Sequence, residues 1–195
     1  KREGLNNNSI ACLLPDPNDP RSVLWIGTKG GGINRLDLRS GQCQHITTDD
    51  GLPNNVVYGI LSANYPPPGT TELWCSTNRG IAKIVLHPST PLRFEITSFT
   101  AATGLQDNEF NTQAFSKSDN GELLFGGING LNHFFSEKLR MDTVQPPVFI
   151  VGIEINHQKS KLPAPAEQLS WLELNHDQNN ISIEFTALDF TDPSK

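Results

Sequence analysis

The sequence is poor in charged residues, in cysteine and in long apolar runs. Charged residues make up 18% of its 195 residues, and 15 Lys and Arg against 21 Asp and Glu give a formal net charge of −6. An acidic chain without a basic cluster is not expected to bind nucleic acid, because phosphate recognition usually needs a concentrated Lys/Arg surface. No apolar run reaches the roughly 18 residues of a membrane-spanning helix, and the first residues do not have the pattern of a signal peptide.

Residues that could carry chemistry are few and scattered. The odd number of cysteines, Cys12, Cys43 and Cys75, excludes a fully paired set of disulfides within the chain. Each lies in a strand-like stretch, where a free Cys usually serves as a small buried hydrophobe. The five His are not spaced as metal ligands, and neither a phosphate-binding glycine loop nor a kinase motif occurs. The sequence therefore predicts no metal site, no cofactor and no catalytic residues.

The residues that replace charge are those of tight turns: 18 Asn, 16 Gly and 14 Pro. They separate short segments rich in Val, Ile, Trp, Phe and Thr, a pattern typical of an all-β protein with many short connections. Two markers repeat with a period of about 50 residues. Leu24, Leu73 and Leu123 each lie in a strand-like segment that leads into a glycine turn, and a Gly-Leu pair followed by Asn precedes each unit.

The second unit shows the pattern most clearly. It predicts four strands, over Val56–Leu61, Leu73–Thr77, Ile81–Val85 and Phe94–Phe99. Four antiparallel strands in about 40–50 residues are typical of a β-propeller blade. The third unit has no evident fourth strand before the prolines at 146 and 147. Because a propeller needs about four to eight blades to close, we interpret residues 1–142 as about three four-stranded blades from the C-terminal part of a propeller.

Residues 143–195 lack this repeat. Val148–Ile155 is expected to be a strand, Trp171–Leu174 alternates as an edge strand would, and the apolar/polar alternation from Asn180 to Phe190 predicts a long half-buried strand. Strands without the period of 50 indicate a second domain that begins near residue 143 and forms part of a β-sandwich.

The segment from Leu24 to Asp37, with Leu-Trp-Ile-Gly-Thr followed by Gly-Gly-Ile-Asn-Arg-Leu-Asp, resembles the regulator-propeller repeat of bacterial two-component sensors. The segments Gly104–Asn111 and Phe125–Leu131 resemble the last blade of such propellers, and Pro147–Phe190 resembles the start of the Ig-like triple-tyrosine domain that follows them. The order of these segments is the one expected for a hybrid two-component sensor of the Bacteroidetes type.

This resemblance implies a periplasmic sensor region, which is the extracytoplasmic part of an inner-membrane protein. Family members sense oligosaccharides and relay the signal through the Ig-like domain to a histidine kinase that controls genes for polysaccharide use. The implied partners are an oligosaccharide, the rest of the parent propeller and a homodimer partner. Nucleic acid is not implied for this segment, and membrane contact is implied only through segments beyond residue 195. Kinase activity would belong to the parent protein and not to this chain.

Trp25 and Trp74 lie at equivalent places in the repeat. Their rings could stack on a sugar, but residues that follow the repeat more often pack between blades, so we expect a structural role. Polar residues near strand beginnings or hairpin tips that break the repeat are better ligand candidates, with a turn-capping role as the alternative for Asn108. These candidates are Asn55, Tyr58, Asn78, Arg79, Asn108, Glu109 and Asn129, with Arg35 and Tyr65 as further ones.

Two other functions are left open. Unpaired strand edges of an unclosed propeller could make the chain a structural or protein-interaction scaffold. A propeller glycosidase would need two facing carboxylates, and the acidic pairs at Asp49-Asp50 and Asp107–Glu109 occupy comparable loops. The segment Ser118–Gly121 resembles the Asp-box of sialidases, but the spacing of its Ser differs and Leu124 stands where Trp is expected. This makes the glycosidase the less favoured alternative.

Overall fold

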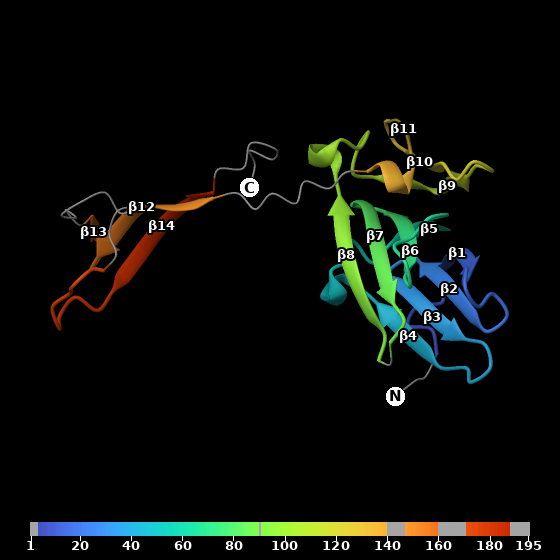
Figure 1. Cartoon of the computed structure of the whole chain (residues 1–195), viewed down its shortest axis with the longest axis horizontal. Coiled ribbons are helices and arrows are strands. Elements are labelled where there is room, and N and C mark those ends of the chain that lie inside the picture. The colour runs from blue at the N-terminus through green and yellow to red at the C-terminus, as the bar shows by residue number, and fades with distance from the viewer. Residues whose placement is uncertain (1–3, 90, 140–146, 160–170, 188–195) are drawn as a thin grey trace. The chain divides into compact units, whose positions relative to one another are not determined.

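The computed structural model describes residues 4–89, 91–139, 147–159 and 171–187, and nearly all of their regular structure is β-strand. The chain divides into two compact units, Lys1–Arg140 and Met141–Lys195 (Figure 1). Helical structure in the described ranges is limited to three short 3-10 turns, η1 (Thr48–Asp50), η2 (Ala101–Thr103) and η3 (Ser136–Lys138). None of the helices in these ranges is long and apolar enough to cross a membrane.

Three antiparallel sheets form the first unit, each with its strands in chain order. The first sheet contains β1 (Ile10–Pro15), β2 (Val23–Thr28), β3 (Ile33–Asp37) and β4 (Cys43–Ile46). The second contains β5 (Val57–Ser62), β6 (Thr71–Thr77), β7 (Gly80–His87) and β8 (Arg93–Phe99), and the third contains β9 (Phe110–Lys117), β10 (Leu123–Gly127) and β11 (Gly130–Phe134). The four strands predicted for the second unit are confirmed to within two residues. The third sheet has three strands within the described residues, as expected from the lack of an evident fourth strand in the third unit of the sequence.

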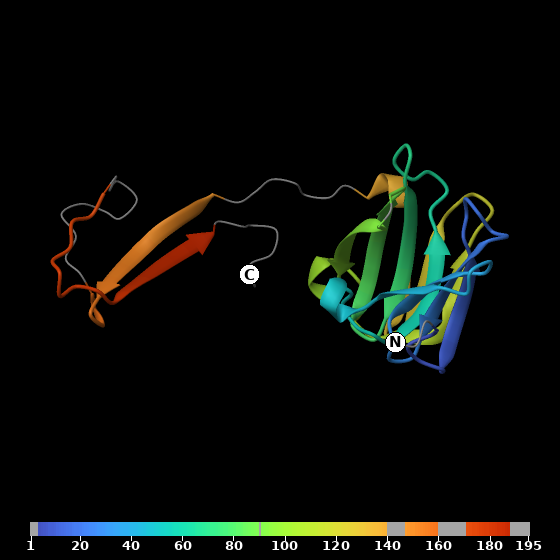
Figure 2. The same cartoon turned by 90° about the horizontal axis from the view of Figure 1, so that it is seen from below.

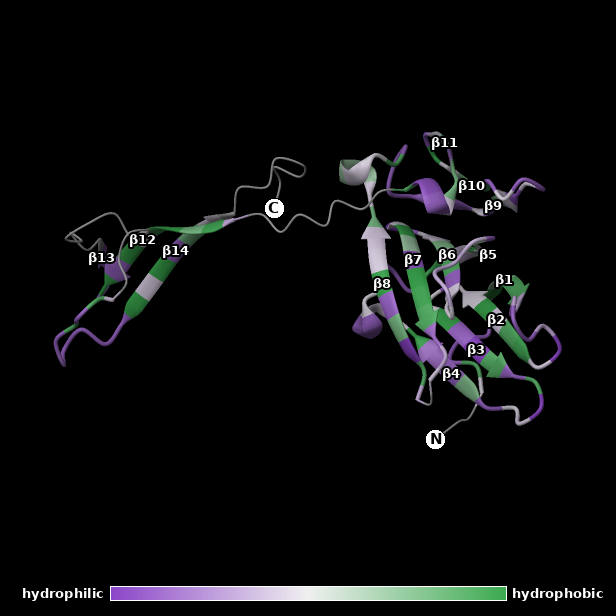
Figure 3. Cartoon of the chain, viewed as in Figure 1, coloured by the Kyte–Doolittle hydropathy of each residue, from purple (hydrophilic) through white to green (hydrophobic). Residues whose placement is uncertain are grey.

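The hairpins form where the turn residues and the apolar pattern agree. Gly80 follows the two-residue tip between β6 and β7 with φ of 105°, which is accessible to glycine without strain. The interior strand β7 is mostly hydrophobic, and each of its residues is buried or partly buried. At the edge of the same sheet, β8 largely alternates exposed polar and partly buried apolar residues (Figure 3). A strand that is covered on both sides is therefore flanked by one that is half exposed.

The core lies between successive sheets. The first strands, β1, β5 and β9, lie next to one another (Figure 2). One apolar cluster joins the first and second sheets around Trp25, Ile60 and Ile84, and another joins the second and third around Trp74 and Phe125. Both tryptophans are only 1% exposed. Their predicted structural role is confirmed, because rings so deeply buried have almost no accessible surface on which a sugar could stack.

The described part of the second unit is one antiparallel sheet of β12 (Val148–Ile155), β13 (Gln158–Lys159) and β14 (Ile181–Ala187), in the order β13-β12-β14. The strand predicted at Val148–Ile155 is confirmed. The one predicted from Asn180 begins at Ile181, and its last residues, 188–190, lie outside the described ranges. The edge strand predicted at Trp171–Leu174 is wrong. These residues have no regular structure, and Trp171 is 75% exposed.

Candidate functional site

The antiparallel order gives each sheet of the first unit two distinct ends. At one end lie the short turns between second and third strands and the links from one sheet to the next; we call this the turn side. At the other end lie the longer loops between first and second strands, residues 16–22, 63–70 and 118–122; we call this the loop side. Lys29 on the turn side of the first sheet forms a β-bridge with Val56, just before β5, so the turn sides of neighbouring sheets adjoin.

All seven candidate residues predicted from the sequence lie on the turn side. Asn55 lies in the link between the first and second sheets, and Tyr58 lies at the start of β5. Asn108 and Glu109 lie in the link before β9. Asn78 and Arg79 form the β6–β7 turn, and Asn129 lies in the β10–β11 turn. The side chains of Tyr58 and Asn78 meet, since the phenol hydroxyl donates a hydrogen bond of 3.0 Å to Asn78 Oδ1. Asn129 is bound to the preceding link, because its backbone amide donates to Gln106 Oε1 at 2.6 Å.

Asn55 and Asn108 perform the same task in successive links. Asn55 Oδ1 accepts a hydrogen bond of 2.8 Å from the amide of Thr48 at the start of η1, and Asn108 Oδ1 accepts one of 2.8 Å from the amide of Ala101 at the start of η2. The carbonyl of Asn55 accepts from the amide of Gly32, which ties each link to the preceding hairpin. The turn-capping alternative therefore describes what both side chains do here, and ligand contact by the seven residues stays a prediction.

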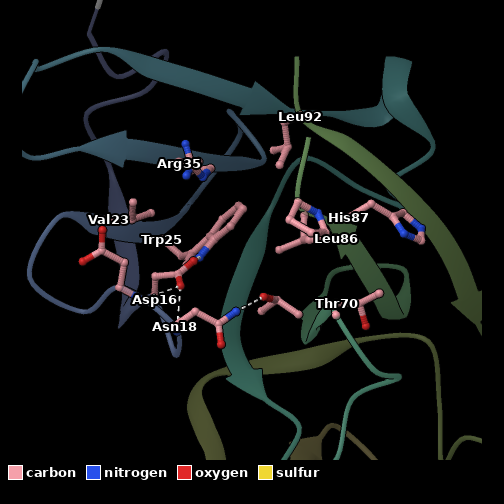
Figure 4. Close-up of a pocket in the computed structure, with 13 residues that line it drawn as sticks. Asp16, Asn18, Val23, Trp25, Arg35, Thr70, Leu86, His87 and Leu92 are labelled. Carbon is pink, nitrogen blue, oxygen red and sulfur yellow. Dashed lines mark hydrogen bonds between the residues drawn. The ribbon is translucent and has the colours of Figure 1, made fainter. Parts of the chain in front are cut away.

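A cleft of about 500 Å³ opens on the loop side, between the first and second sheets (Figure 4). None of the seven predicted residues lines it. The first sheet contributes Asp16, Asn18, Asp19, Val23, Trp25 and Arg35, and the second sheet contributes Gly69, Thr70, Thr71, Leu86, His87, Pro88 and Leu92. Its size is within the range of about 300–1,000 Å³ that is usual for small-molecule sites.

Asp16 organises the first-sheet wall of this cleft. It is only 8% exposed, and Trp25 Nε1 donates to its Oδ2 at 2.8 Å. The amides of Asn18 and Asp19 donate to its Oδ1 at 2.9 and 3.1 Å, which folds the proline-rich loop back on the sheet. Asn18 Nδ2 in turn donates to the hydroxyl of Thr71 on the second sheet. The loop around Asp16 is thus held against the first sheet and linked to the second.

The rest of the cleft combines one cationic group with an apolar wall. Arg35 is paired with Trp25 across β2 and β3, and its guanidinium carbon lies 5.9 Å from the centre of the indole ring. Among the residues that the structure describes, its guanidinium donates to Gln44 Oε1 at 3.3 Å, and most of its five N–H donors have no protein partner there. Leu86, which belongs to the core, and the partly buried Leu92 form the facing wall.

Arg35 was a further candidate in the sequence, and Tyr65, the other one, lies exposed in the β5–β6 loop on the same side. The sequence gives no sign that the residues of the second sheet facing Arg35 belong to a site. The pairing of Arg35 with Trp25 can be read from the hairpin register, and that is the signal that was available. The proximity of Leu86 and Leu92 cannot be found in this way, because it arises only when the two sheets pack together.

Other chemistry in the described ranges is structural. No three His, Cys, Asp or Glu side chains there gather into a metal-binding group. Burial raises the pKa of Cys12 to about 11 and that of Cys75 to about 12, so both thiols are protonated and inert at neutral pH. Two of the carboxylates that a glycosidase could use support their own loops: Asp50 Oδ2 accepts from the amide of Thr47 at 2.9 Å, and Asp107 Oδ1 from that of Asn108 at 2.6 Å.

Comparisons with known proteins support the resemblance found in the sequence. No protein-family model matches the chain. Over 173 residues it is 24% identical to histidine kinase P4 of Formosa agariphila; the match covers 85% of this chain and 11% of that protein. The chain thus spans about a ninth of the length of this curated relative.

The solved structures agree. The extracellular domain of the hybrid two-component system BT3049 of B. thetaiotaomicron matches 95% of this chain and 24% of its own length, with 24% identity and a TM-score of 0.65. That of BT4673, from the same organism, matches 94% of this chain and 29% of its own length, with 16% identity and a TM-score of only 0.39, too low to support a shared fold. The chain is therefore similar in sequence to a histidine kinase and in fold to the extracellular domain of a hybrid two-component sensor.

Proposed function

We propose that this chain is part of the extracytoplasmic sensor region of a hybrid two-component histidine kinase and that it binds an oligosaccharide. The observation that carries the proposal is the shared fold with the extracellular domain of such a system over 95% of the chain, at a TM-score of 0.65. Similarity to a histidine kinase over 85% of the chain supports it. The segment itself has sensory and not catalytic work to do, and a periplasmic location follows from this role.

In this proposal the three sheets of the first unit are β-propeller blades and the second unit is the start of an Ig-like domain. The meander order of each sheet and the mutual contact of β1, β5 and β9 are what inner strands of neighbouring blades require. Ile10 and Leu13 on β1 are 49% and 56% exposed, as is Leu131 on β11 at 54%. Further blades of the parent propeller would cover these side chains, since the chain spans only 24% of the neighbouring structure.

The signal would pass from the propeller through the Ig-like domain to the kinase and so to genes for polysaccharide use. Such a relay needs two conformational states of the sensor region, and a ligand can shift the equilibrium between them only by its difference in affinity for the two states. Ligand binding must therefore be shown first, because the relay depends on it.

Thermal unfolding of the whole chain in the presence of defined oligosaccharides tests the binding. A ligand that binds only the folded state stabilises it by about 2.7 kcal/mol at a hundred times its Kd, which shifts the melting temperature by several degrees. We expect one structural class of oligosaccharide to raise the midpoint while its constituent monosaccharides do not. A cooperative transition that no oligosaccharide moves would contradict oligosaccharide binding by this segment.

A further inference from the structure

We propose that the cleft on the loop side, between the first and second sheets, is the place where this segment holds one sugar residue of the oligosaccharide. The inference rests on the proposed function and assigns it a site. It differs from the expectation drawn from the sequence, which put the ligand on the turn side.

The polar groups of the cleft are of the kinds that sugar hydroxyls need. A hydroxyl both donates and accepts, so a site for it must present donors beside acceptors. The guanidinium of Arg35 supplies donors from one wall. The exposed carboxylate of Asp19 and the side-chain carbonyl of Asn18, whose amide nitrogen is engaged by Thr71, supply acceptors from the same loop.

The apolar wall complements these groups. Leu86 and Leu92 of the second sheet face the hairpin that bears Trp25 and Arg35 (Figure 4). A pyranose ring has one face rich in C–H groups, and such a face is desolvated favourably against accessible aliphatic surface. The partly buried Leu92 offers most of this surface, since Leu86 is only 5% exposed and packs in the core. A volume of about 500 Å³ is sufficient for a sugar residue.

The site is also built in advance. The carboxylate of Asp16 accepts hydrogen bonds from the indole of Trp25 and two backbone amides and is only 8% exposed, so its main role is to orient the loop. The bond from Asn18 to Thr71 fixes the width of the cleft where the two sheets meet. A preformed pocket loses little conformational entropy when a ligand enters, which raises affinity.

Isothermal titration of the whole chain with oligosaccharides tests the assignment, with neutral xylan and β-glucan fragments in one arm and oligogalacturonates in the other. The informative variants are Arg35→Gln and Asp19→Asn. Arg35 is partly exposed and Asp19 is exposed, so neither substitution removes a core side chain. Each removes hydrogen bonds to the ligand, and we expect affinity to fall by about tenfold or more. Arg39→Gln, in the exposed β3–β4 turn, is the matched control and should bind as the parent does.

Arg79→Gln on the turn side separates the two candidate locations. Unchanged affinity in this variant, with losses in Arg35→Gln and Asp19→Asn, supports the cleft. Loss in Arg79→Gln with full affinity in the two cleft variants overturns the cleft but leaves oligosaccharide binding intact. No titratable binding by the parent chain overturns both proposals.

Hydrogen exchange gives a readout that does not depend on any substitution. A ligand in the cleft should slow exchange in residues 16–23 and 69–71, which belong to its two walls. Protection confined to the β6–β7 turn around Asn78 would place the ligand on the turn side and overturn the assignment.

Discussion

The buried thiols of Cys12 and Cys75 predict a loss of stability in alkaline solution. Burial raises the pKa of Cys12 to about 11 and that of Cys75 to about 12, from an ordinary value of 9.0. The folded state therefore keeps the protons that the unfolded chain begins to release near pH 9. Stability is unaffected by these groups below that pH and falls above it, by about 1.4 kcal/mol per pH unit for each thiol until its folded-state pKa is reached.

The effect is large enough to measure between pH 8 and pH 10. Over this interval each thiol should lower the free energy of unfolding by about 1.3 kcal/mol, and the two together by about 2.7 kcal/mol. Lysine and tyrosine also titrate in this range, so the unmodified chain alone cannot isolate the thiols. Cys75→Ala removes one of them, and urea denaturation of both proteins at both pH values gives the difference. The variant should lose about 1.3 kcal/mol less than the parent between the two pH values.

Cys43→Ala is the matched control. This thiol is only partly buried; burial raises its pKa as well, but by less than for the other two cysteines, so the variant should follow the parent more closely. Pulse alkylation with mass spectrometry provides an independent check, because Cys43 should be labelled in the folded protein well before Cys12 and Cys75. Equal alkaline losses in the parent and in Cys75→Ala would refute the reasoning.

Two further predictions concern a buried hydrogen bond and the backbone of the hairpins. Trp74 Nε1 donates to Glu72 at 2.7 Å, so Glu72→Ala should destabilise the fold by about 2–4 kcal/mol in urea, and a loss below about 1 kcal/mol would show the bond to be dispensable. Gly80 and Gly130 both have positive φ, but an added Cβ would collide with the carbonyl of Phe99 only at Gly80. Gly80→Ala should therefore melt well below Gly130→Ala, and equal melting temperatures would contradict a steric cause.

The sequence was sufficient to predict the strands of the first unit because several signals agreed there. In the second repeat, β-branched and aromatic segments alternate with turns rich in Asn, Gly and Pro, and all four strands form as expected. The failure at Trp171–Leu174 has a physical reason. Alternation shows that a segment could present one apolar face, but a strand also needs a hydrogen-bonded neighbour, and the segment has none within the described residues.

The site was harder to predict than the fold. Asn55 has the residue type, position and polarity of a ligand contact, yet its side chain binds the amide of Thr48 in the same link. The sequence alone cannot separate these roles, because both favour Asn in a loop. Arg35 and Leu86 are far apart along the chain, and only the packing of one sheet on the next brings them to the same cleft.

The repeat itself favours the loop side as the place of recognition. A site that binds one ligand must differ from its counterparts in the other units, so it should lie where the repeat is broken. The turn side follows the repeat: Thr47 and Thr100 directly precede equivalent 3-10 turns, and an Asn seven residues after the first residue of each turn caps it. The loop side does not follow it, since the loop around Asp16 and the proline-rich residues 63–70 have different sequences and different hydrogen bonds. The expectation that ligand residues break the repeat therefore favours the loop side over the turn side, once the hydrogen bonds of each loop are known.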